Sequence, residues 1–367
     1  MLENISKYLR YVQKKLFSFL EEELGGLSEK QRKLILILEF LDLGSHLRTL
    51  GGGPGRPACD RGAIARAFVA KMVYNLTSIV DLIDSLRSDP KLRRICGFER
   101  ISDIPSASTF SRAYEEFSKS EFPQRVQQAL LKKYLDSAKV DYISRDSTDI
   151  VVREKVKWNS PQKKKKPPKR RRGRPKKDTE RVQQEATRLQ KQKRMSTEEM
   201  LADLPKDCDR GYKTKAGKPY YWIGYKLNID CIDNEIIISS LLTSASLHDS
   251  QAAIPLAALS DQKVKSRFQV MDSAYHAKDI IKYCLSLGSQ PIIEANPRRG
   301  SKDKSSPPPE PFYSKCRSTC ERVFAFLKES FGVSIIRVRG YQKVAAHLAF
   351  SILALTAWQI LKLILRC

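Results

Sequence analysis

Three acidic residues occupy positions from which their side chains could carry out phosphodiester chemistry. Asp146 follows a short strand-like run in "ISRDSTDI", Asp272 follows another in "QVMDSAYHA", and Glu321 lies in the helical pattern "KCRSTCERVFAFLK". Chemistry assisted by two Mg²⁺ ions needs clustered carboxylates, because one ion activates the attacking oxygen and the other stabilises the leaving oxygen. Considered alone, Asp146 is typical of a surface residue at a strand exit. Together with the other two acids it is predicted to be a metal ligand.

Two basic residues flank Glu321 on the same predicted helix. At about 100° per residue, Arg317, Glu321 and Lys328 lie within roughly 60° of one another around the helix axis. The two cations could therefore hold phosphate while the glutamate binds metal. The alternative is a solvated helix face with ordinary ion pairs at four-residue spacing.

Other polar residues compete for roles in the same site. Asp149 is a rival to Asp146 as the first ligand, although it lies further past the predicted strand. His248 and Asp249, in "LHDSQ", either shape a turn or take a direct part in the chemistry. Cys316 and Cys320 form a pair four residues apart, without a second Cys/His pair at zinc-finger spacing.

The elements that must position these residues belong to an α/β region from about residue 138 to 367. Strands are predicted at residues 140–146, 220–233, 235–246, 267–275 and 290–298. Helices are predicted at 250–262, 277–288, 314–332 and 347–365. Strands that come first and then alternate with helices indicate a mixed sheet covered by helices.

Residues 1–137 form a different, mostly helical region. Apolar residues recur there at three- and four-residue intervals, interrupted by the turn-rich "GGGPGRPACD". Ser106 or Ser108 is a plausible N-cap of the last part. Periodicity does not separate a helix-turn-helix from a plain helical bundle, so both remain open.

A basic insertion, roughly residues 154–210, interrupts the α/β region after its first strand. Residues 163–177, "KKKKPPKRRRGRPKK", contain 11 basic residues and no acidic one, which predicts a disordered segment that attracts phosphate. Arg172-Gly173-Arg174-Pro175 resembles an AT-hook, in which arginines enter the narrow minor groove of A/T-rich DNA. Plain attraction to phosphate and reading of A/T sequence both remain open.

Composition restricts the class of protein. A formal charge of +26 over 367 residues favours a polyanionic partner, either nucleic acid or an anionic membrane. The eight scattered cysteines and the start of the chain, which lacks a signal-peptide pattern, favour a cytoplasmic protein with free thiols. The apolar residues 347–365 carry their polar residues near one side, which favours a core-packing helix over a membrane span.

The ordered set of motifs resembles the DDE transposases of prokaryotic insertion sequences, which have an RNase H-like catalytic core. "DST" at Asp146 and "DSAYHA" at Asp272 are similar to the family's two Asp motifs, and "LHDSQ" to its His-Asp turn. Arg317, Glu321 and Lys328 match its Arg-x3-Glu-x6-Lys signature. Ser314 stands where many relatives have a tyrosine, and the neighbouring Tyr313 is one residue out of register. The resemblance extends over nearly the whole chain.

The resemblance implies a function and a set of partners. It implies cleavage at the ends of a mobile element, dependent on two Mg²⁺ ions (Mn²⁺ is expected to substitute), followed by transfer of the freed 3′-hydroxyl ends into target DNA. It further implies a helical DNA-binding N-terminal region, double-stranded DNA with terminal inverted repeats as the partner, a homodimer on DNA, and a location at the nucleoid rather than a membrane. A nuclease of the same fold without strand transfer, and a DNA-binding protein that has lost the chemistry, are the alternatives.

Overall fold

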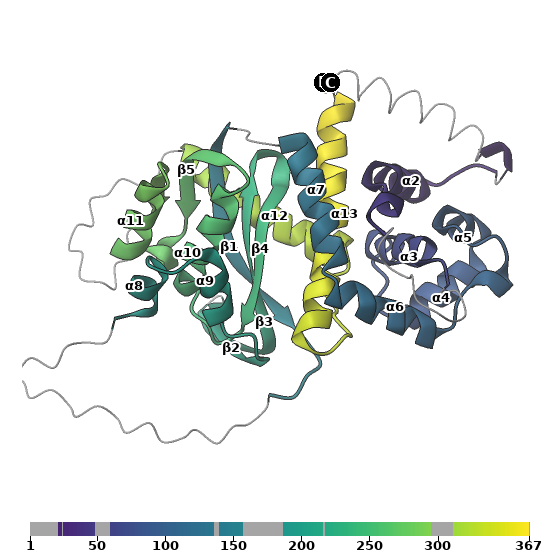
Figure 1. The fold of residues 1–367 in the computed structure, drawn as a ribbon, viewed down its shortest axis with the longest axis horizontal. Helices are drawn as coiled ribbons and strands as arrows, with labels where there is room; N and C mark the ends of the chain where they lie inside the picture. The colour runs from purple at the N-terminus through teal and green to yellow at the C-terminus, as the bar shows by residue number, and fades with distance from the viewer. Residues whose placement is uncertain are drawn as a thin grey trace, which may run out of the picture.

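The structure is a computed structural model that describes residues 21–23, 25–47, 59–135, 139–156, 186–215, 217–294 and 311–366. It has a helical region followed by a mixed sheet covered by helices, as expected from the sequence (Figure 1). The predicted DNA contacts Arg172 and Arg174 lie outside the described residues.

The N-terminal region is built of short, well-capped helices. At α4 and α6 the N-cap serines Ser78 and Ser106 accept hydrogen bonds from backbone N–H groups of the first turn, so Ser106 is the cap that the sequence left open between two serines. Asp89 caps α5, whose first residue, Pro90, has no backbone N–H and needs no hydrogen-bond acceptor. The described helices of this region are α2 (Glu29–Leu41), η1 (Leu43–His46), α3 (Arg61–Val73), α4 (Ile79–Ser88), α5 (Pro90–Cys96), η2 (Ile101–Asp103), α6 (Ala107–Lys119) and α7 (Phe122–Leu135).

The sheet has the RNase H-like arrangement. Its strands are β1 (Lys139–Val151), β2 (Asp209–Lys215), β3 (Lys218–Ile232), β4 (Ile236–Ser244), β5 (Lys265–Met271) and β6 (Gln290–Ile293). In the centre, β1 pairs antiparallel with β3 and parallel with β5. Outside them, β4 pairs antiparallel with β3, and β6 pairs parallel with β5. The short β2 extends the outer edge of β3 next to β4.

Helices cover both faces of this sheet. Tyr142 of β1 shares a hydrogen bond with Thr319 of α12, with 3.2 Å between the hydroxyl oxygens. Arg145, an odd number of residues further along, points to the opposite face, where Ser260 of α10 binds its partner Asp230. Thus α12 and α10 lie on opposite faces. The remaining described helices of this region are α8 (Arg188–Gln192), α9 (Thr197–Asp203), η3 (Asp233–Glu235), α10 (Ser250–Asp261), η4 (Ser273–Tyr275), α11 (Lys278–Ser286), α12 (Pro311–Ser330) and α13 (Tyr341–Arg366).

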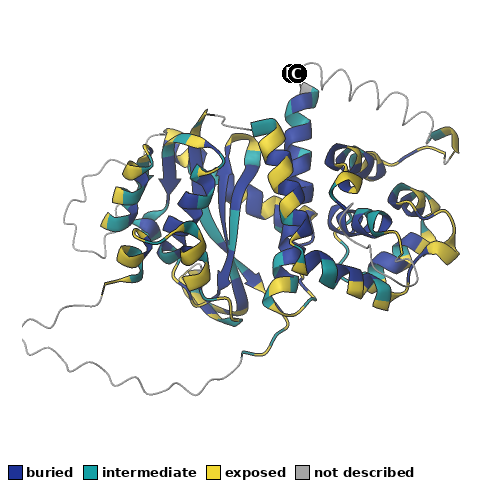
Figure 2. Cartoon of the chain, viewed as in Figure 1, coloured by how far each residue is buried: buried dark blue, intermediate teal, exposed yellow. Residues whose placement is uncertain are grey.

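Helix α13 joins the two parts of the molecule. It lies with α7 between the N-terminal helices and the sheet (Figure 1), and its residues are mostly buried (Figure 2). Residues Tyr341–Leu365 are long and apolar enough to span a membrane, but 78% of the apolar window is buried inside the protein. The predicted core-packing helix is therefore confirmed, because this apolar surface is covered by α2, α3, α6, α7 and β4.

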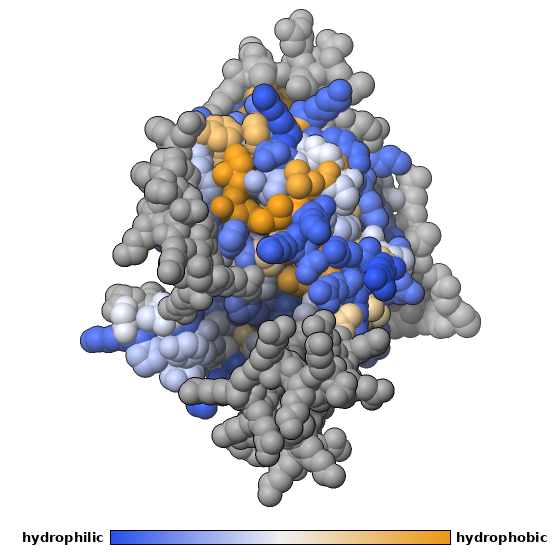
Figure 3. All heavy atoms as spheres, turned by 90° about the vertical axis from the view of Figure 1, so that its left-hand side faces the viewer, coloured by the Kyte–Doolittle hydropathy of each residue, from blue (hydrophilic) through white to orange (hydrophobic). Residues whose placement is uncertain are grey.

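The other edge of the sheet is formed by β6, which lies beside α11. Viewed from this end, the described surface is mainly hydrophilic, with apolar atoms gathered in a patch (Figure 3). Leu285 of α11 is 51% exposed. Directly after β6 comes the exposed Glu294.

The first strand is longer than the sequence suggested. The polar "DST" was predicted to leave the sheet at Asp146, but β1 continues to Val151. Its partner β3 pairs with it along the whole of this extension, and Ile150 is 1% exposed in the core. Asp146 consequently lies inside a strand, held by backbone hydrogen bonds on the β3 side.

Part of the insertion, which was predicted to be disordered over about residues 154–210, is ordered in the structure, whereas its most basic stretch, residues 163–177, lies outside the described residues. Its described part, from residue 186, contains α8, α9 and the beginning of β2, a strand that periodicity missed. Thr187 and Ser196 form capping boxes at the two helices. Met200 is 2% exposed and packs in a core cluster that includes α10 residues. A few apolar anchors thus order a segment whose average composition is polar.

Candidate active site

Two of the predicted site residues are adjacent where the parallel pairing of β1 and β5 ends. Arg145 and Met271 form the last register pair of these strands, so Asp146 and Asp272 occupy the next positions. Asp146 lies an even number of residues after Tyr142 and therefore faces α12. Neighbouring strands are about 4.8 Å apart, which allows the two carboxylates to share a ligand.

Backbone hydrogen bonds orient both carboxylates. Asp146 Oδ1 accepts from the N–H of Ser147 at 2.7 Å, and Asp272 Oδ1 accepts from the N–H of Ala274 at 2.9 Å. The Asp272 bond forms because Asp272 is the N-cap of the short helix η4. In both residues this backbone hydrogen bond is accepted by Oδ1 and not by Oδ2.

The electrostatic environment disfavours negative charge at this point. Burial, together with the nearby Asp272 and Asp249, raises the pKa of Asp146 to about 7. Burial also raises the pKa of Asp272, with Asp249 and Glu294 contributing. The Arg317 guanidinium favours the ionised form of both aspartates but does not offset these effects.

The three signature residues of α12, Arg317, Glu321 and Lys328, have different environments. The side chain of Arg317 is 42% exposed, yet its Nε is buried without a hydrogen-bond partner among the described residues. Lys328 Nζ donates to Thr148 Oγ1 at 2.8 Å and lies 3.4 Å from Asp149 Oδ1. Lys328 is thus directed toward β1, and Arg317 is close enough to influence the pKa values of Asp146 and Asp272.

Glu321 is not drawn into the cluster in this structure. Its side chain is 60% exposed and lies 3.9 Å from Arg317 Nη2. Among the described residues, no three His, Cys, Asp or Glu side chains are arranged to hold a metal ion. The assignment of Glu321 as a ligand therefore stays a prediction that depends on the family signature.

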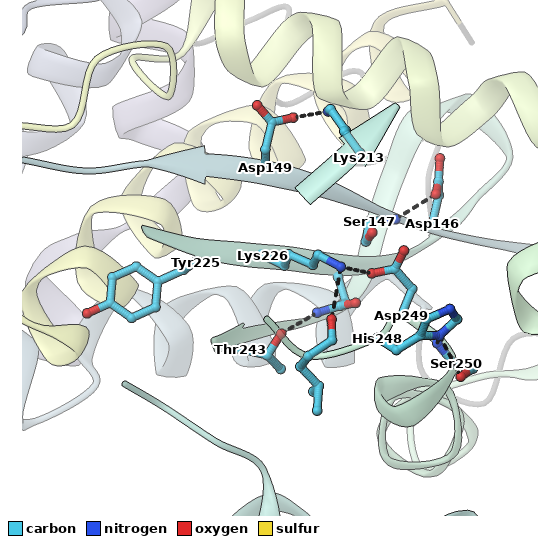
Figure 4. Close-up of polar contacts among 12 residues, drawn as sticks. Asp146, Ser147, Asp149, Lys213, Tyr225, Lys226, Thr243, His248, Asp249 and Ser250 are labelled. Atoms are coloured by element: carbon cyan, nitrogen blue, oxygen red, sulfur yellow. Dashed lines mark hydrogen bonds and ion pairs between the residues drawn. The ribbon is translucent and has the colours of Figure 1, made fainter. Parts of the chain in front are cut away.

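The His-Asp turn belongs to the edge of the same site (Figure 4). Lys226 Nζ donates to Asp249 Oδ1 at 2.8 Å and to the carbonyl oxygen of Leu247 at 2.9 Å. His248 Nδ1 bonds Ser250 Oγ at 2.8 Å, at the start of α10. This network shapes the turn, and it also brings the Asp249 charge close enough to influence both site aspartates.

Asp149, the rival first ligand, has cationic partners of its own. Its Oδ1 lies 2.5 Å from Lys213 Nζ and 3.4 Å from Lys328 Nζ. Burial alone would raise the pKa of Asp149, but these lysines lower it to about 2. A carboxylate already neutralised by two lysines is a poorer candidate for a metal ligand than Asp146.

A buried ion pair beneath the aspartates was not anticipated. Arg145 and Asp230 are cross-strand partners on β1 and β3, with side chains 1% and 0% exposed. Arg145 donates from Nε and Nη2 to the two Asp230 oxygens at 2.8 and 2.7 Å, and Ser260 Oγ donates to Asp230 at 2.6 Å. The sequence signal for this pair was Arg145 itself, because an arginine within a predicted buried strand needs an acidic partner.

Glu294 was missed as well. The β5–β6 register ends at Met271 and Ile293, so Glu294 is next to Asp272 in the same way that Asp272 is next to Asp146. Its position after "QPII" is the same strand-end signal that identified Asp272. Cys316 and Cys320, by contrast, are buried free thiols on α12, and Cys320 Sγ donates to the Ser144 carbonyl oxygen at 3.2 Å.

The residues present fit a divalent cation by charge and donor type. Hard cations prefer carboxylate oxygens, and two oriented carboxylates lie here near a third acid, Asp249. The pKa of Asp146 is raised first by burial of the carboxylate and then by the negative charges of Asp272 and Asp249. A bound cation would supply the missing positive charge.

Comparison with known families agrees with this arrangement. The family model described as "Transposase DDE domain" matches residues 146–357, and "Transposase domain (DUF772)" matches residues 22–116. Comparison with curated proteins and with solved structures found no match. The first family match begins at Asp146 and covers the sheet from that residue onward, both site aspartates, α12 and most of α13, which is more than half of the chain. The chain therefore belongs to the family of transposases with a DDE domain.

Proposed function

We propose that this transposase cleaves DNA at the ends of its element in a metal-dependent reaction and then joins the freed 3′-hydroxyl ends to target DNA. The observation that carries the proposal is the adjacent placement of Asp146 and Asp272, partly buried and oriented by backbone N–H groups. Clustered acidity of this kind serves phosphodiester chemistry when metal ions neutralise it.

Asp146, Asp272 and Glu321 are the residues that would hold two Mg²⁺ ions, and Mn²⁺ should substitute. When bound, the ions would activate the attacking oxygen and stabilise the leaving oxygen. To take part, Glu321 would have to turn from its exposed position beside Arg317 toward the two aspartates.

The protein's own cations have the complementary task. Arg317 and Lys328 would hold the phosphate group, because Lys328 reaches β1 and Arg317 is close enough to act on the charges of both site aspartates. Arg317 suits this role because its buried Nε still lacks an acceptor among the described residues.

The partners follow from the charge and the helical region. The net charge of +26 favours double-stranded DNA, and the helices of residues 22–116 would recognise the terminal inverted repeats. Two ends must be brought together for transposition, so a homodimer on DNA at the nucleoid is expected. Arg172 and Arg174 would add contacts to DNA from the basic insertion.

The test replaces each proposed ligand by its neutral isostere. Asp146→Asn, Asp272→Asn and Glu321→Gln should each reduce Mg²⁺-dependent cleavage of element-end DNA to background while DNA binding persists. Asp141→Asn is the matched control, because it neutralises an exposed acid of β1 that does not belong to the proposed site, and it should retain cleavage within about tenfold.

Three results would separate the alternatives. Robust cleavage by Asp146→Asn or Asp272→Asn would reject the site. Cleavage without joining of 3′ ends to a target plasmid would indicate a nuclease. Binding of DNA without any cleavage by the unaltered protein, in Mg²⁺ or Mn²⁺, would indicate a DNA-binding protein that has lost the chemistry. Inverted repeats and a short target duplication around the gene would support transposition.

A further inference from the structure

The β2–β3 hairpin carries a pair of exposed aromatic rings. Tyr212 faces Tyr221 across the two strands, and Arg210 faces Ile223. Alternate residues of a strand share a face, so these four residues lie together and are named here the tyrosine platform. The two rings have centroids 5.1 Å apart, and Tyr212, Tyr221 and Ile223 are 57%, 55% and 39% exposed.

The other face of the hairpin already supplies its packing. Trp222 is 5% exposed and its ring covers Gly211, where an added Cβ would come within 2.3 Å of it. Tyr220 stacks on Trp222 with ring centroids 5.9 Å apart. The tyrosine platform is therefore not needed to bury the hairpin, and grouped apolar residues left in solvent mark a contact surface.

Charge indicates which kind of partner this surface takes. The guanidinium of Arg210 lies 5.3 Å from the centre of the Tyr221 ring, and Lys218 is exposed at the hairpin turn. Exposed aromatic rings beside cations suit a nucleic acid strand, because bases stack on the rings while cations hold phosphate. The chain's net charge of +26 acts in the same direction.

The hairpin is close to the candidate active site. Lys213 follows Tyr212 on β2, points to the opposite face and pairs with Asp149 of β1. Asp149 lies three residues from Asp146, about 10 Å along a strand. A DNA strand whose phosphodiester reaches Asp146 would therefore extend past the hairpin, which forms the lower end of the sheet in Figure 1.

We propose that the tyrosine platform stacks an unpaired base of the DNA beside the cleavage site. The occupant is a nucleobase in a single-stranded or locally opened segment, because a base inside a closed duplex does not offer its face to a ring. The identity of the occupant rests on the proposed function, which brings DNA to Asp146. Its role is to hold the opened strand in place relative to the two aspartates.

The experiment measures binding without divalent metal, so that no cleavage is needed. Two fluorescein-labelled 30-base-pair duplexes are compared, one fully paired and one with a three-base mismatched bubble that contains 2-aminopurine. The unaltered protein should bind the bubble about 5- to 100-fold more tightly and quench the 2-aminopurine. Tyr212→Ala/Tyr221→Ala should remove this preference and the quenching, while affinity for the paired duplex changes less than twofold.

Two control variants accompany this comparison. Tyr212→Phe/Tyr221→Phe keeps both rings and should retain the preference for the bubble. Phe326→Ala removes an exposed ring of α12 that has Lys362 5.6 Å from its centre, and it should also leave the preference intact. Thermal unfolding of each variant checks that the hairpin change leaves the fold unaltered.

Several outcomes would overturn the proposal. The unaltered protein could bind both duplexes equally, the alanine variant could keep its preference, or the phenylalanine variant could lose it. A change of oligomeric state without DNA in the alanine variant would instead make the platform a contact between copies of the chain. A protein that stacks the bubble but never cleaves DNA would contradict the proposed function alone.

Discussion

Asp146 and Asp149, which lie three residues apart in β1, have pKa values that are shifted in opposite directions. The pKa of Asp146 is raised to about 7 by burial and by neighbouring acids, whereas Lys213 and Lys328 hold the pKa of Asp149 at about 2. The ionised Asp146, where a cation is expected, therefore destabilises the folded protein, whereas the ionised Asp149 stabilises it. The contrast predicts different responses to the same substitution.

At pH 8 without metal, Asp146→Asn should stabilise the protein by on the order of 2 kcal/mol. The unfolded state ionises this group near pH 3.8 and the folded state only near 7, so the penalty develops between these values and is complete above pH 7. The stabilisation should therefore shrink as the pH falls toward 4. Urea unfolding at several pH values measures it, and a loss of stability at pH 8 would show that the carboxylate is not destabilising.

Asp149→Asn is the matched comparison and should have the opposite sign. A folded-state pKa below the ordinary value contributes stability that is present above pH 3.8 and is lost as the pH falls through about 2. Its removal should cost about 1 kcal/mol at pH 8, because the surrounding lysines are partly exposed and solvent screens them. Equal effects of the two variants would mean that both carboxylates have ordinary environments.

At the scale of elements, the buried Arg145–Asp230 pair holds the strands that carry the site. Arg145 precedes Asp146, faces Asp230 on β3 and is the register partner of Met271, which precedes Asp272. A bidentate pair at this crossing resists any slip of β1 against β3, and a slip of one residue would turn Asp146 to the other face.

Removing one partner of this pair should be far more costly than removing both. Arg145→Met leaves Asp230 charged and buried, and should destabilise the protein by about 3–5 kcal/mol. Arg145→Met with Asp230→Leu should recover most of that loss, as judged by urea unfolding. Arg322→Met is the control, since it breaks an ion pair with Glu235 in which Arg322 is 43% exposed, and it should cost less than about 1 kcal/mol. A double variant as unstable as the single one would contradict this account.

At the scale of the whole molecule, one core connects the N-terminal helices to the sheet. The same cluster contains Phe68 of α3, Phe350 of α13 and Ile229 of β3, the cross-strand partner of Asp146. Helix α13 supplies the continuity, so movement of the helical region would be transmitted through packed side chains rather than through a linker. Whereas this core extends over both parts of the molecule, much of the positive charge is concentrated in one stretch, because residues 163–177 alone contain 11 basic residues.

That concentration of charge predicts separate effects on folding and binding. Replacing residues 163–177 with a Gly/Ser linker should leave the melting temperature nearly unchanged, because so polar a tract buries little apolar surface. If about six phosphate contacts are lost, the slope of log K against log salt should flatten by about five units. Arg172→Ala with Arg174→Ala should weaken binding selectively on A/T-rich DNA if the motif acts as an AT-hook. An unchanged salt slope would mean that the tract does not contact DNA.

The sequence by itself determined the class of fold and the positions of the two aspartates. Helices α10, α11 and α12 and strands β3 to β6 were readable because their apolar periodicity is local and uninterrupted. Asp146 and Asp272 were predicted together because each follows a strand-like run and because their motifs, with the signature on α12, resemble those of the DDE transposases. The signature on α12 was readable because a helix converts spacing directly into a shared face.

Only the tertiary structure decided what depends on partners distant along the chain. β1 runs on through polar residues to Val151 because β3 continues to pair with it, and α8 and α9 are ordered because α10 covers their few apolar residues. Asp149 is neutralised by Lys213 and Lys328, and the buried Arg145 is paired with Asp230. Each of these partners is at least 64 residues away along the chain. Apolar periodicity shows which side of a helix or strand is buried. It does not show which strand pairs with that segment or which charged side chains lie beside it, and these features depend on both.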